Sequence, residues 1–146
     1  MKKYSFYLLA FITVFLLLGS CTSTSEIKVS LDQEFTLTIN QSAQIEGENL
    51  QISFKEVLED SRCAIGATCI WEGRVSLALE INDNGSPYKM ILIQSGMNDQ
   101  YTNETYKAYQ FAFKVNPYPE LGTEIAIGDY QLLMTVSGLP PIVITR

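Results

Sequence analysis

Thiols are the reactive side chains that stand out in this chain of 146 residues, which has three cysteines and no histidine. Cys63 and Cys69 flank the short segment 64–68, and Cys21 lies near the amino terminus. A redox-active pair usually has Cys-x-x-Cys spacing and a neighbour that lowers the thiol pKa, and a zinc site takes more Cys or His ligands than two. We therefore predict a structural disulfide between Cys63 and Cys69, to which the loop-closure model assigns about 2.4 kcal/mol.

Cys21 carries a different prediction, which is lipidation. It follows a basic start at Lys2-Lys3, an apolar run over residues 8–18 and the sequence Leu18-Gly19-Ser20. This is the pattern of a secretory signal that ends in a lipobox, where the cysteine thiol takes a diacylglycerol. A membrane-spanning helix is the alternative, but it needs about 20 apolar residues and this run is too short.

The predicted organisation has three parts: a lipoprotein signal peptide over residues 1–20, a lipidated tether over 21–26 and a single domain over 27–146. Acyl chains would hold the protein to a bacterial membrane in the cell envelope, either facing the periplasm or on the cell surface. Lipidation of Cys21 leaves the other two cysteines as an even pair in an oxidising compartment, which favours the disulfide.

The charge balance of the predicted mature chain excludes one class of partner. Lys2 and Lys3 are two of the ten basic residues, so eight remain against sixteen acidic ones, a net charge of −8. Nucleic-acid binding needs a basic surface, and no basic stripe is present. We therefore expect no nucleic-acid partner, and a membrane contact that depends on the lipid anchor.

Enzyme activity is not expected. The absence of histidine removes the commonest general base and the usual catalytic triads. A hydrolase that works with carboxylates alone is the remaining enzymatic alternative, with Glu59 and Asp60 or Asp99 and Glu104 as the pairs. Both pairs lie in turn-like segments where acidic side chains are usually solvated, and no glycine-rich phosphate-binding motif is present. We predict no catalytic residues and no cofactor.

Calcium is a further alternative, since oxygen-bearing side chains cluster at residues 82–84 and again at Asn98, Asp99 and Glu104. Neither cluster has the spacing of an EF-hand loop. Asn and Asp side chains form turns by bonding their own backbone, and this is the role we predict for both clusters. No metal site is therefore expected.

The elements that would position the cysteines are extended strands. From Cys69 onward the apolar residues alternate, and Trp71, Val75 and Leu77 fall on one face, so a strand running on from the second cysteine with Trp71 buried is predicted. Gly73 would let a neighbouring chain approach closely or mark a bulge. The segment 50–58 reads as the preceding strand, with a bulge at Lys55-Glu56 and with Gly66 at the tip of the connecting loop.

The residues around the cysteines resemble a pattern found in small exported bacterial proteins. Asp60-Ser61-Arg62-Cys63 followed by Cys69-Ile70-Trp71-Glu72-Gly73 is similar to Asp-Ser-Arg-Cys-Pro, a short gap and Cys-x-Trp-x-Gly in that largely uncharacterised family, many of whose members are lipoproteins. This chain departs from the pattern at Ala64, where the family usually has proline. The resemblance implies a β-rich exported domain and implies no activity.

The rest of the chain predicts further short strands and no amphipathic helix. Asn84-Gly85 indicates a hairpin, and the apolar strand that follows, 88–94, is predicted to be central in its sheet. Residues 96–105 read as a loop. Seven to nine short strands favour an all-β antiparallel β-sandwich, with an immunoglobulin-like Greek key if Tyr130 forms a tyrosine corner, and with a small closed β-barrel as the alternative.

Candidate binding residues come from the loops. Tyr101 and Tyr118 are the aromatic residues that we expect to be exposed, and Arg62 is expected to bond Asp60 or backbone carbonyls rather than a ligand.

The first functional hypothesis is a non-enzymatic, lipid-anchored envelope protein that acts as a binding or accessory module for an envelope protein or glycan. The second is an inhibitor or ligand-capturing module, which would display Ile65 outward on the disulfide-braced loop, whereas a structural turn would bury it.

Overall fold

The fold is described by a computed structural model that covers residues 25–96 and 100–140. The predicted signal peptide and Cys21 lie outside the described residues. Within them, no helix is long and apolar enough to cross a membrane. The elements are β1 Glu26–Val29, β2 Glu34–Thr38, β3 Ser42–Ile45, β4 Leu50–Asp60, β5 Arg74–Asp83, β6 Ser86–Ser95, β7 Thr102–Tyr106, β8 Tyr109–Asn116, the 3₁₀ helix η1 Ile127–Asp129 and β9 Gln131–Gly138.

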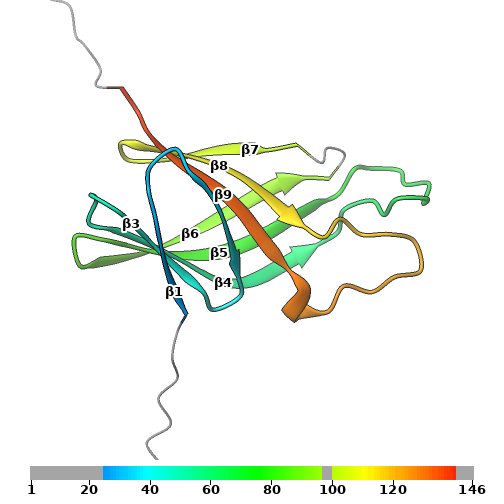
Figure 1. The fold of residues 1–146 in the computed structure, drawn as a ribbon. Helices are drawn as coiled ribbons and strands as arrows, with labels where there is room; N and C mark the ends of the chain where they lie inside the picture. The colour runs from blue at the N-terminus through cyan, green and yellow to red at the C-terminus, as the bar shows by residue number, and fades with distance from the viewer. Residues whose placement is uncertain (1–24, 97–99, 141–146) are drawn as a thin grey trace, which may run out of the picture.

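Two sheets pack face to face, which confirms the predicted β-sandwich (Figure 1). One has the strand order β1-β3-β4-β5-β6 and the other β2-β9-β8-β7. All neighbouring strands are antiparallel except β1 and β3. The sheets do not close into a barrel, because β1 and β6 form the edges of one sheet and β2 and β7 those of the other. The runs β3 to β6 and β7 to β9 are meanders, so the strand order is not the immunoglobulin-like Greek key.

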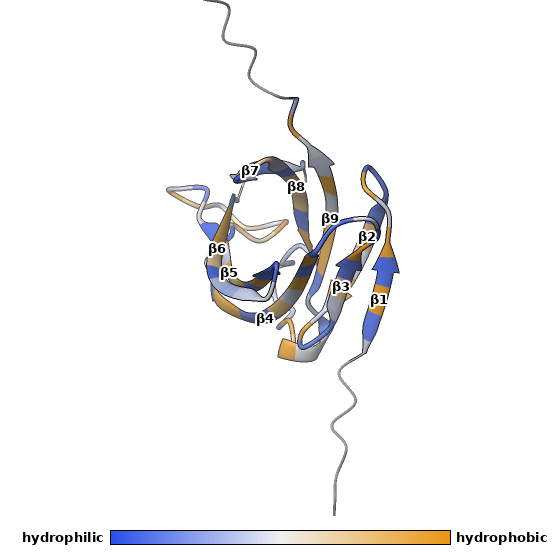
Figure 2. Cartoon of the chain, turned by 90° about the vertical axis from the view of Figure 1, so that its left-hand side faces the viewer, coloured by the Kyte–Doolittle hydropathy of each residue, from blue (hydrophilic) through white to orange (hydrophobic). Residues whose placement is uncertain are grey.

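The core lies between the sheets and is built by period-two alternation. Figure 2 shows this alternation as hydrophobic and hydrophilic bands that succeed one another along the strands. In β5 the side chains of Val75, Leu77, Leu79 and Ile81 are fully buried, as predicted. Phe54 of β4 and Phe111 and Phe113 of β8 meet them in the core cluster. Burying such a side chain contributes about 1.5–3 kcal/mol, so these alternating faces stabilise the sandwich.

Two local predictions are confirmed in the long hairpins. The pairing of β4 with β5 shifts register between Phe54 and Glu56, which is the predicted bulge. Asn84 and Gly85 have positive φ angles of 53° and 79° and connect β5 to β6 as a tight turn. Positive φ at both central residues matches the twist of an antiparallel pair.

Three predictions about strands are wrong. β5 begins at Arg74 rather than at Cys69, and Trp71 lies outside it and is 72% exposed instead of buried. β6 is an edge strand, not a central one, and its second apolar face leaves Ile91 and Ile93 exposed. The segment 96–105 is not all loop, since β7 begins at Thr102 and pairs with β8.

Gly73, just before β5, lies in close contact with the backbone just after β4, as its predicted role requires. Its φ is +67°, and a Cβ atom there would lie 1.8 Å from the carbonyl oxygen of Ser61. Gly96, just after β6, lies equally close to the backbone next to Gly73. A Cβ atom at Gly96 would lie 2.0 Å from the carbonyl oxygen of Glu72. The amide of Gly96 donates to the carbonyl of Gly73 at 3.0 Å. Three backbone segments therefore meet where only hydrogen atoms fit.

The substitution Gly73→Ala is expected to destabilise the domain by about 3 kcal/mol, because it adds a clash with backbone to the strain of positive φ. Gly47→Ala is the matched control. Gly47 has a φ of +82° but nothing within 4 Å of the added Cβ, so the same change there should cost about 1 kcal/mol. Urea unfolding of both variants measures the difference, and equal losses would contradict the close approach at Gly73.

Candidate functional site

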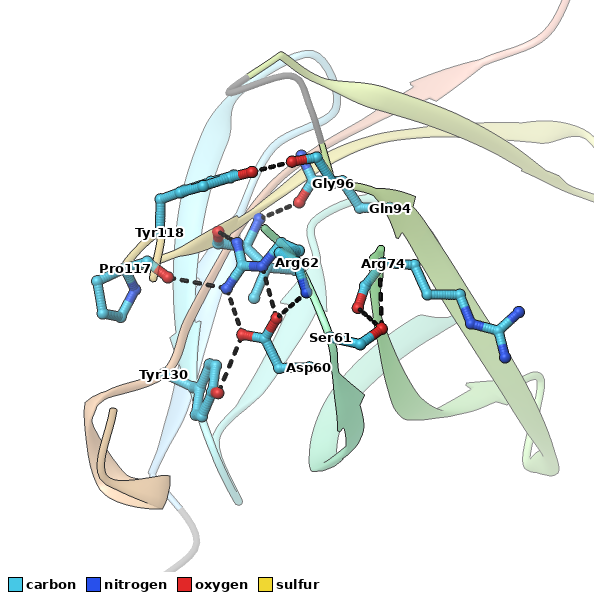
Figure 3. Close-up of polar contacts among 10 residues, drawn as sticks. Asp60, Ser61, Arg62, Arg74, Gln94, Gly96, Pro117, Tyr118 and Tyr130 are labelled. Atoms are coloured by element: carbon cyan, nitrogen blue, oxygen red, sulfur yellow. Dashed lines mark hydrogen bonds and ion pairs between the residues drawn. The ribbon is translucent and has the colours of Figure 1, made fainter. Parts of the chain in front are cut away.

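A buried ion pair organises the end of the sandwich that carries the disulfide (Figure 3). The side chain of Arg62 is 1% exposed, and its Nε and Nη2 donate to Oδ1 and Oδ2 of Asp60 at 2.8 and 2.6 Å. Its Nη1 donates to the carbonyl of Val115 and its Nη2 to that of Pro117, both at 2.9 Å. Since Asp60 ends β4 and Val115 lies in β8 of the other sheet, one side chain joins the two layers. The predicted partners of Arg62 are confirmed.

Two tyrosines enclose this ion pair. The ring of Tyr118 lies over the Arg62 guanidinium, 5.0 Å from ring centroid to Cζ, and its hydroxyl donates to the carbonyl of Gly96. The hydroxyl of Tyr130 donates to Oδ2 of Asp60 at 3.1 Å. Burial, then the nearby Asp60 charge and this hydrogen bond, raise the pKa of Tyr130 to about 12. A tyrosine corner bonds backbone a few residues upstream, so Tyr130 does not form one.

The disulfide loop begins directly after Arg62. Cys63 and Cys69 are disulfide-bonded as predicted, with their Cα atoms 6.0 Å apart, and Gly66 at the tip has a φ of +87°. The loop is also held from outside by the segment 119–121. The amide of Ile65 donates to the carbonyl of Pro119 at 2.9 Å, and Ile65 in turn accepts from the amide of Leu121 at 3.0 Å. The covalent bond and this bridge together fix a connection that has no strand structure.

This braced loop exposes large apolar side chains to solvent. Ile65 is 61% exposed, Ile70 99% and Trp71 72%, and the adjoining Leu121 is 67% exposed. We call these four residues the apolar tip. Single exposed apolar residues are common on protein surfaces, but several gathered at one place usually mark an interaction site.

Charged and polar groups border the apolar tip. Arg74 and Glu59 form an ion pair of 3.1 Å whose side chains are 55% and 43% exposed. The Ser61 hydroxyl donates to Glu59 at 2.9 Å, and this bond, followed by that from Arg74, lowers the pKa of the Glu59 carboxyl. An apolar centre with a polar rim is the usual composition of a protein interface.

The predicted binding residues do not form one site. Ile65 is exposed on the disulfide loop, which is the outcome expected of a loop-presenting module. Tyr118 is half-buried against Arg62 and belongs to the framework, contrary to the exposure predicted for it. Tyr101 is exposed, but its hydroxyl donates to Glu34 of β2 rather than meeting the disulfide loop.

Sequence reasoning missed Ile70, Trp71 and Leu121. The alternation of apolar residues from Cys69 onward predicts Trp71 on a buried face and Ile70 on the solvent-facing one, so it does not predict a surface site that contains both. The sequence signal for Ile70 and Trp71 is that two large apolar residues directly follow a cysteine that closes a short loop.

The acidic side chains at this end of the sandwich are engaged in ion pairs. Glu59 and Asp60 are bonded to Arg74 and Arg62, respectively. Within residues 25–96 and 100–140, no three His, Cys, Asp or Glu side chains are placed to hold a metal ion. At the predicted turn 82–84, the Asp83 carboxylate accepts hydrogen bonds from Lys107 and Asn84, which lower its pKa. Asn98 and Asp99 lie outside the described residues.

Comparison with known proteins gives no match: no protein-family model matches the chain, and neither a curated protein nor a solved structure is significantly similar to it. The interpretation of the site therefore depends on its own geometry.

Removing Arg62 should be far more costly than removing the exposed arginine nearby. Arg62→Ala leaves the Asp60 carboxylate buried without its counter-ion, and we expect a loss of about 3–5 kcal/mol in the free energy of unfolding. Arg74→Ala breaks an exposed pair with Glu59, for which about 0–1 kcal/mol is usual. Chemical denaturation of the two variants makes the comparison, and similar small losses would show that Arg62 does not hold the two sheets together.

Stability should fall in strongly alkaline solution as two tyrosines ionise. The pKa of Tyr130 is raised from 10.0 to about 12, and a hydrogen bond to Glu48 raises that of Tyr109 to about 12 as well. The folded state therefore binds these protons more tightly than the unfolded chain, so their contribution is complete below about pH 10 and is lost as the pH rises to about 12. Urea unfolding across this range measures the slope.

The variants Tyr130→Phe and Tyr109→Phe control this measurement, because phenylalanine has no proton to lose. Each should reduce the alkaline slope of stability, and the double variant should reduce it most. A slope that is the same in the double variant and in the unchanged protein would contradict the assignment of the raised pKa values.

Proposed function

We propose that the protein is a non-enzymatic, lipid-anchored protein of the bacterial cell envelope that binds another protein through its apolar tip. The observation that carries the proposal is the exposure of Ile70 and Trp71, which directly follow the disulfide-closed loop. Of the two functional hypotheses, the outward position of Ile65 favours the module that presents a loop from a rigid sandwich over an accessory subunit.

The composition of the apolar tip suits a protein partner. Tryptophan is among the residues that contribute most to protein interfaces, where it fills a pocket at the centre of the contact. A loop that is already ordered loses little conformational entropy on binding, so more of the contact energy appears as affinity. The disulfide and the bridge between Ile65 and Glu120 supply that order here.

Insertion of the apolar tip into the membrane is less consistent with its surroundings. The acidic side chains of Glu72, Glu120 and Glu124 lie exposed in the segments that carry the tip, and anionic headgroups would repel them. The described chain enters the fold at edge strand β1, whereas the disulfide loop extends from the far ends of β4 and β5 (Figure 1). An anchor on Cys21 would therefore attach to a different part of the sandwich from the tip.

The other parts of the proposal have support of their own. The apolar run that ends in Leu18-Gly19-Ser20-Cys21 supports the signal peptide and the lipid anchor. The absence of histidine from the chain supports a role other than catalysis, as does the use of Asp60 as the counter-ion of Arg62.

Affinity capture with matched variants tests the binding role. The full-length protein, solubilised in detergent and immobilised, is exposed to envelope extract of the source organism, and the captured proteins are quantified by mass spectrometry. We expect one partner in near-stoichiometric amount, with capture reduced at least about tenfold by Ile70→Ser combined with Trp71→Ser, because both anchors of the contact are lost.

The control is Ile91→Ser combined with Ile93→Ser, which removes the same kind of exposed surface from the outer face of β6. Capture should be unchanged in this variant, and the melting temperature of the tip variant should stay close to that of the unchanged protein. A partner retained equally by all three proteins would contradict a role for the apolar tip, and so would the absence of any stoichiometric partner.

A further inference from the structure

A hollow of about 430 Å³ lies on the other side of the molecule from the apolar tip, and its lining is polar. It is lined by Gln44, Asn49, Gln51, Asn82, Asn84 and Gly85, which is five carboxamides, one glycine and no charged side chain. We call it the amide groove. Its volume falls within the range of about 300–1,000 Å³ that is usual for ligand pockets, but such pockets are mostly apolar. Its occupant must therefore be recognised by hydrogen bonds.

The strands bring these carboxamides together in register. Gln44 of β3 stands opposite Gln51 of β4, and Gln51 stands opposite Asn82 of β5. Asn49 and Asn84 lie in the two adjoining turns, which are joined by a hydrogen bond of 2.9 Å from the amide of Asn84 to the carbonyl of Asn49. These turns lie together at the end of the sandwich opposite the disulfide loop (Figure 1).

Hydrogen bonds donated by three of the amide groups hold those groups in place. Nε2 of Gln44 donates to the carbonyl of Glu48 at 2.9 Å, and Nε2 of Gln51 donates to Glu26 at 2.7 Å. Nδ2 of Asn49 donates to Asn84 at 3.0 Å. In these three groups the amide oxygen remains to accept, and the amino groups of Gln51 and Asn49 each keep a second N–H to donate. The amide groove thus offers ordered acceptors and donors, which suits a ligand whose groups can do both.

Asn82 differs from the other carboxamides of the amide groove in the hydrogen bonding of its oxygen. Its Oδ1 is buried and has no hydrogen-bond partner among the residues that the structure describes. A buried polar atom without a partner is costly, and native structures rarely keep one without a reason. The amide can turn about χ2, a soft torsion, without breaking a bond to this oxygen. A ligand hydroxyl could then meet it.

We infer that the amide groove binds a neutral saccharide. Sugar hydroxyls donate and accept hydrogen bonds without charge, which matches carboxamides in a lining that carries no charge. An anion would find no cationic side chain in the lining. A metal cation would prefer carboxylates, but Glu26 accepts from Gln51 and Asp83 is paired with Lys107. The inference concerns a different surface from the apolar tip and holds or fails independently of the protein-binding role.

Saturation-transfer difference NMR on the full-length protein tests the inference. The probes are chitotetraose, cellotetraose and maltotetraose at millimolar concentration, in a detergent without a sugar headgroup. At least one probe should give a difference signal, and its dissociation constant should rise about tenfold or more in Asn82→Ala and in Gln51→Ala. Asn103→Ala is the control, since Asn103 is an exposed amide of β7 in the other sheet, and it should leave binding unchanged.

A melting curve separates a binding role of Asn82 from a structural one. Because its Oδ1 is unpartnered, Asn82→Ala should melt no lower than the unchanged protein while losing the saccharide. The inference is overturned if no probe binds, if binding survives both groove variants, or if Asn82→Ala lowers the melting temperature by several degrees. Tight binding of calcium alone that depends on Asn82 would identify an ion site instead and would also overturn it.

Discussion

The disulfide end of the molecule depends on the buried ion pair of Asp60 and Arg62. A guanidinium removed from water is tolerated only when its donors are used, and here they go to one carboxylate and to the carbonyls of Val115 and Pro117. The carboxylate comes from the end of β4, and the carbonyls come from Val115 in β8 and from Pro117 just after it. One side chain therefore sets the ends of the two sheets relative to each other. The disulfide loop starts at the next residue, Cys63, so its position follows from this pair.

A loop placed so firmly could have turned its apolar residues inward. Burying a large apolar side chain contributes about 1.5–3 kcal/mol, and the apolar tip leaves most of that unrealised for Ile65, Ile70, Trp71 and Leu121. A partner that covers the tip would recover it at a small entropic cost, because the loop is already ordered. The opposite end of the sandwich has a contrasting character, with carboxamides in place of apolar groups. The same scaffold thus offers two surfaces with different chemistries.

The sequence predicted what depends on near neighbours. Period-two alternation identified the buried face of β5, and the closeness of Asp60 and Arg62 in the chain indicated their pairing. Alternation failed at Trp71, because apolar residues in a loop can match the strand period without forming a strand. It also failed for β6, where two apolar faces suggested a central strand but sheet order places it at an edge. Contacts such as Tyr130 with Asp60 join residues far apart in the chain, and no spacing rule relates them.

A rigid framework holds the apolar tip exposed, in the position from which we propose that it binds a protein. Trp71 is the only tryptophan of the chain, so its fluorescence reports on the tip alone. Time-resolved anisotropy of this emission, recorded with and without acrylamide, measures both motion and exposure. We expect a slow anisotropy decay that follows the tumbling of the whole molecule, together with strong quenching by acrylamide. A decay dominated by fast local motion would contradict the rigid framework, and an emission protected from acrylamide would contradict the exposed tip.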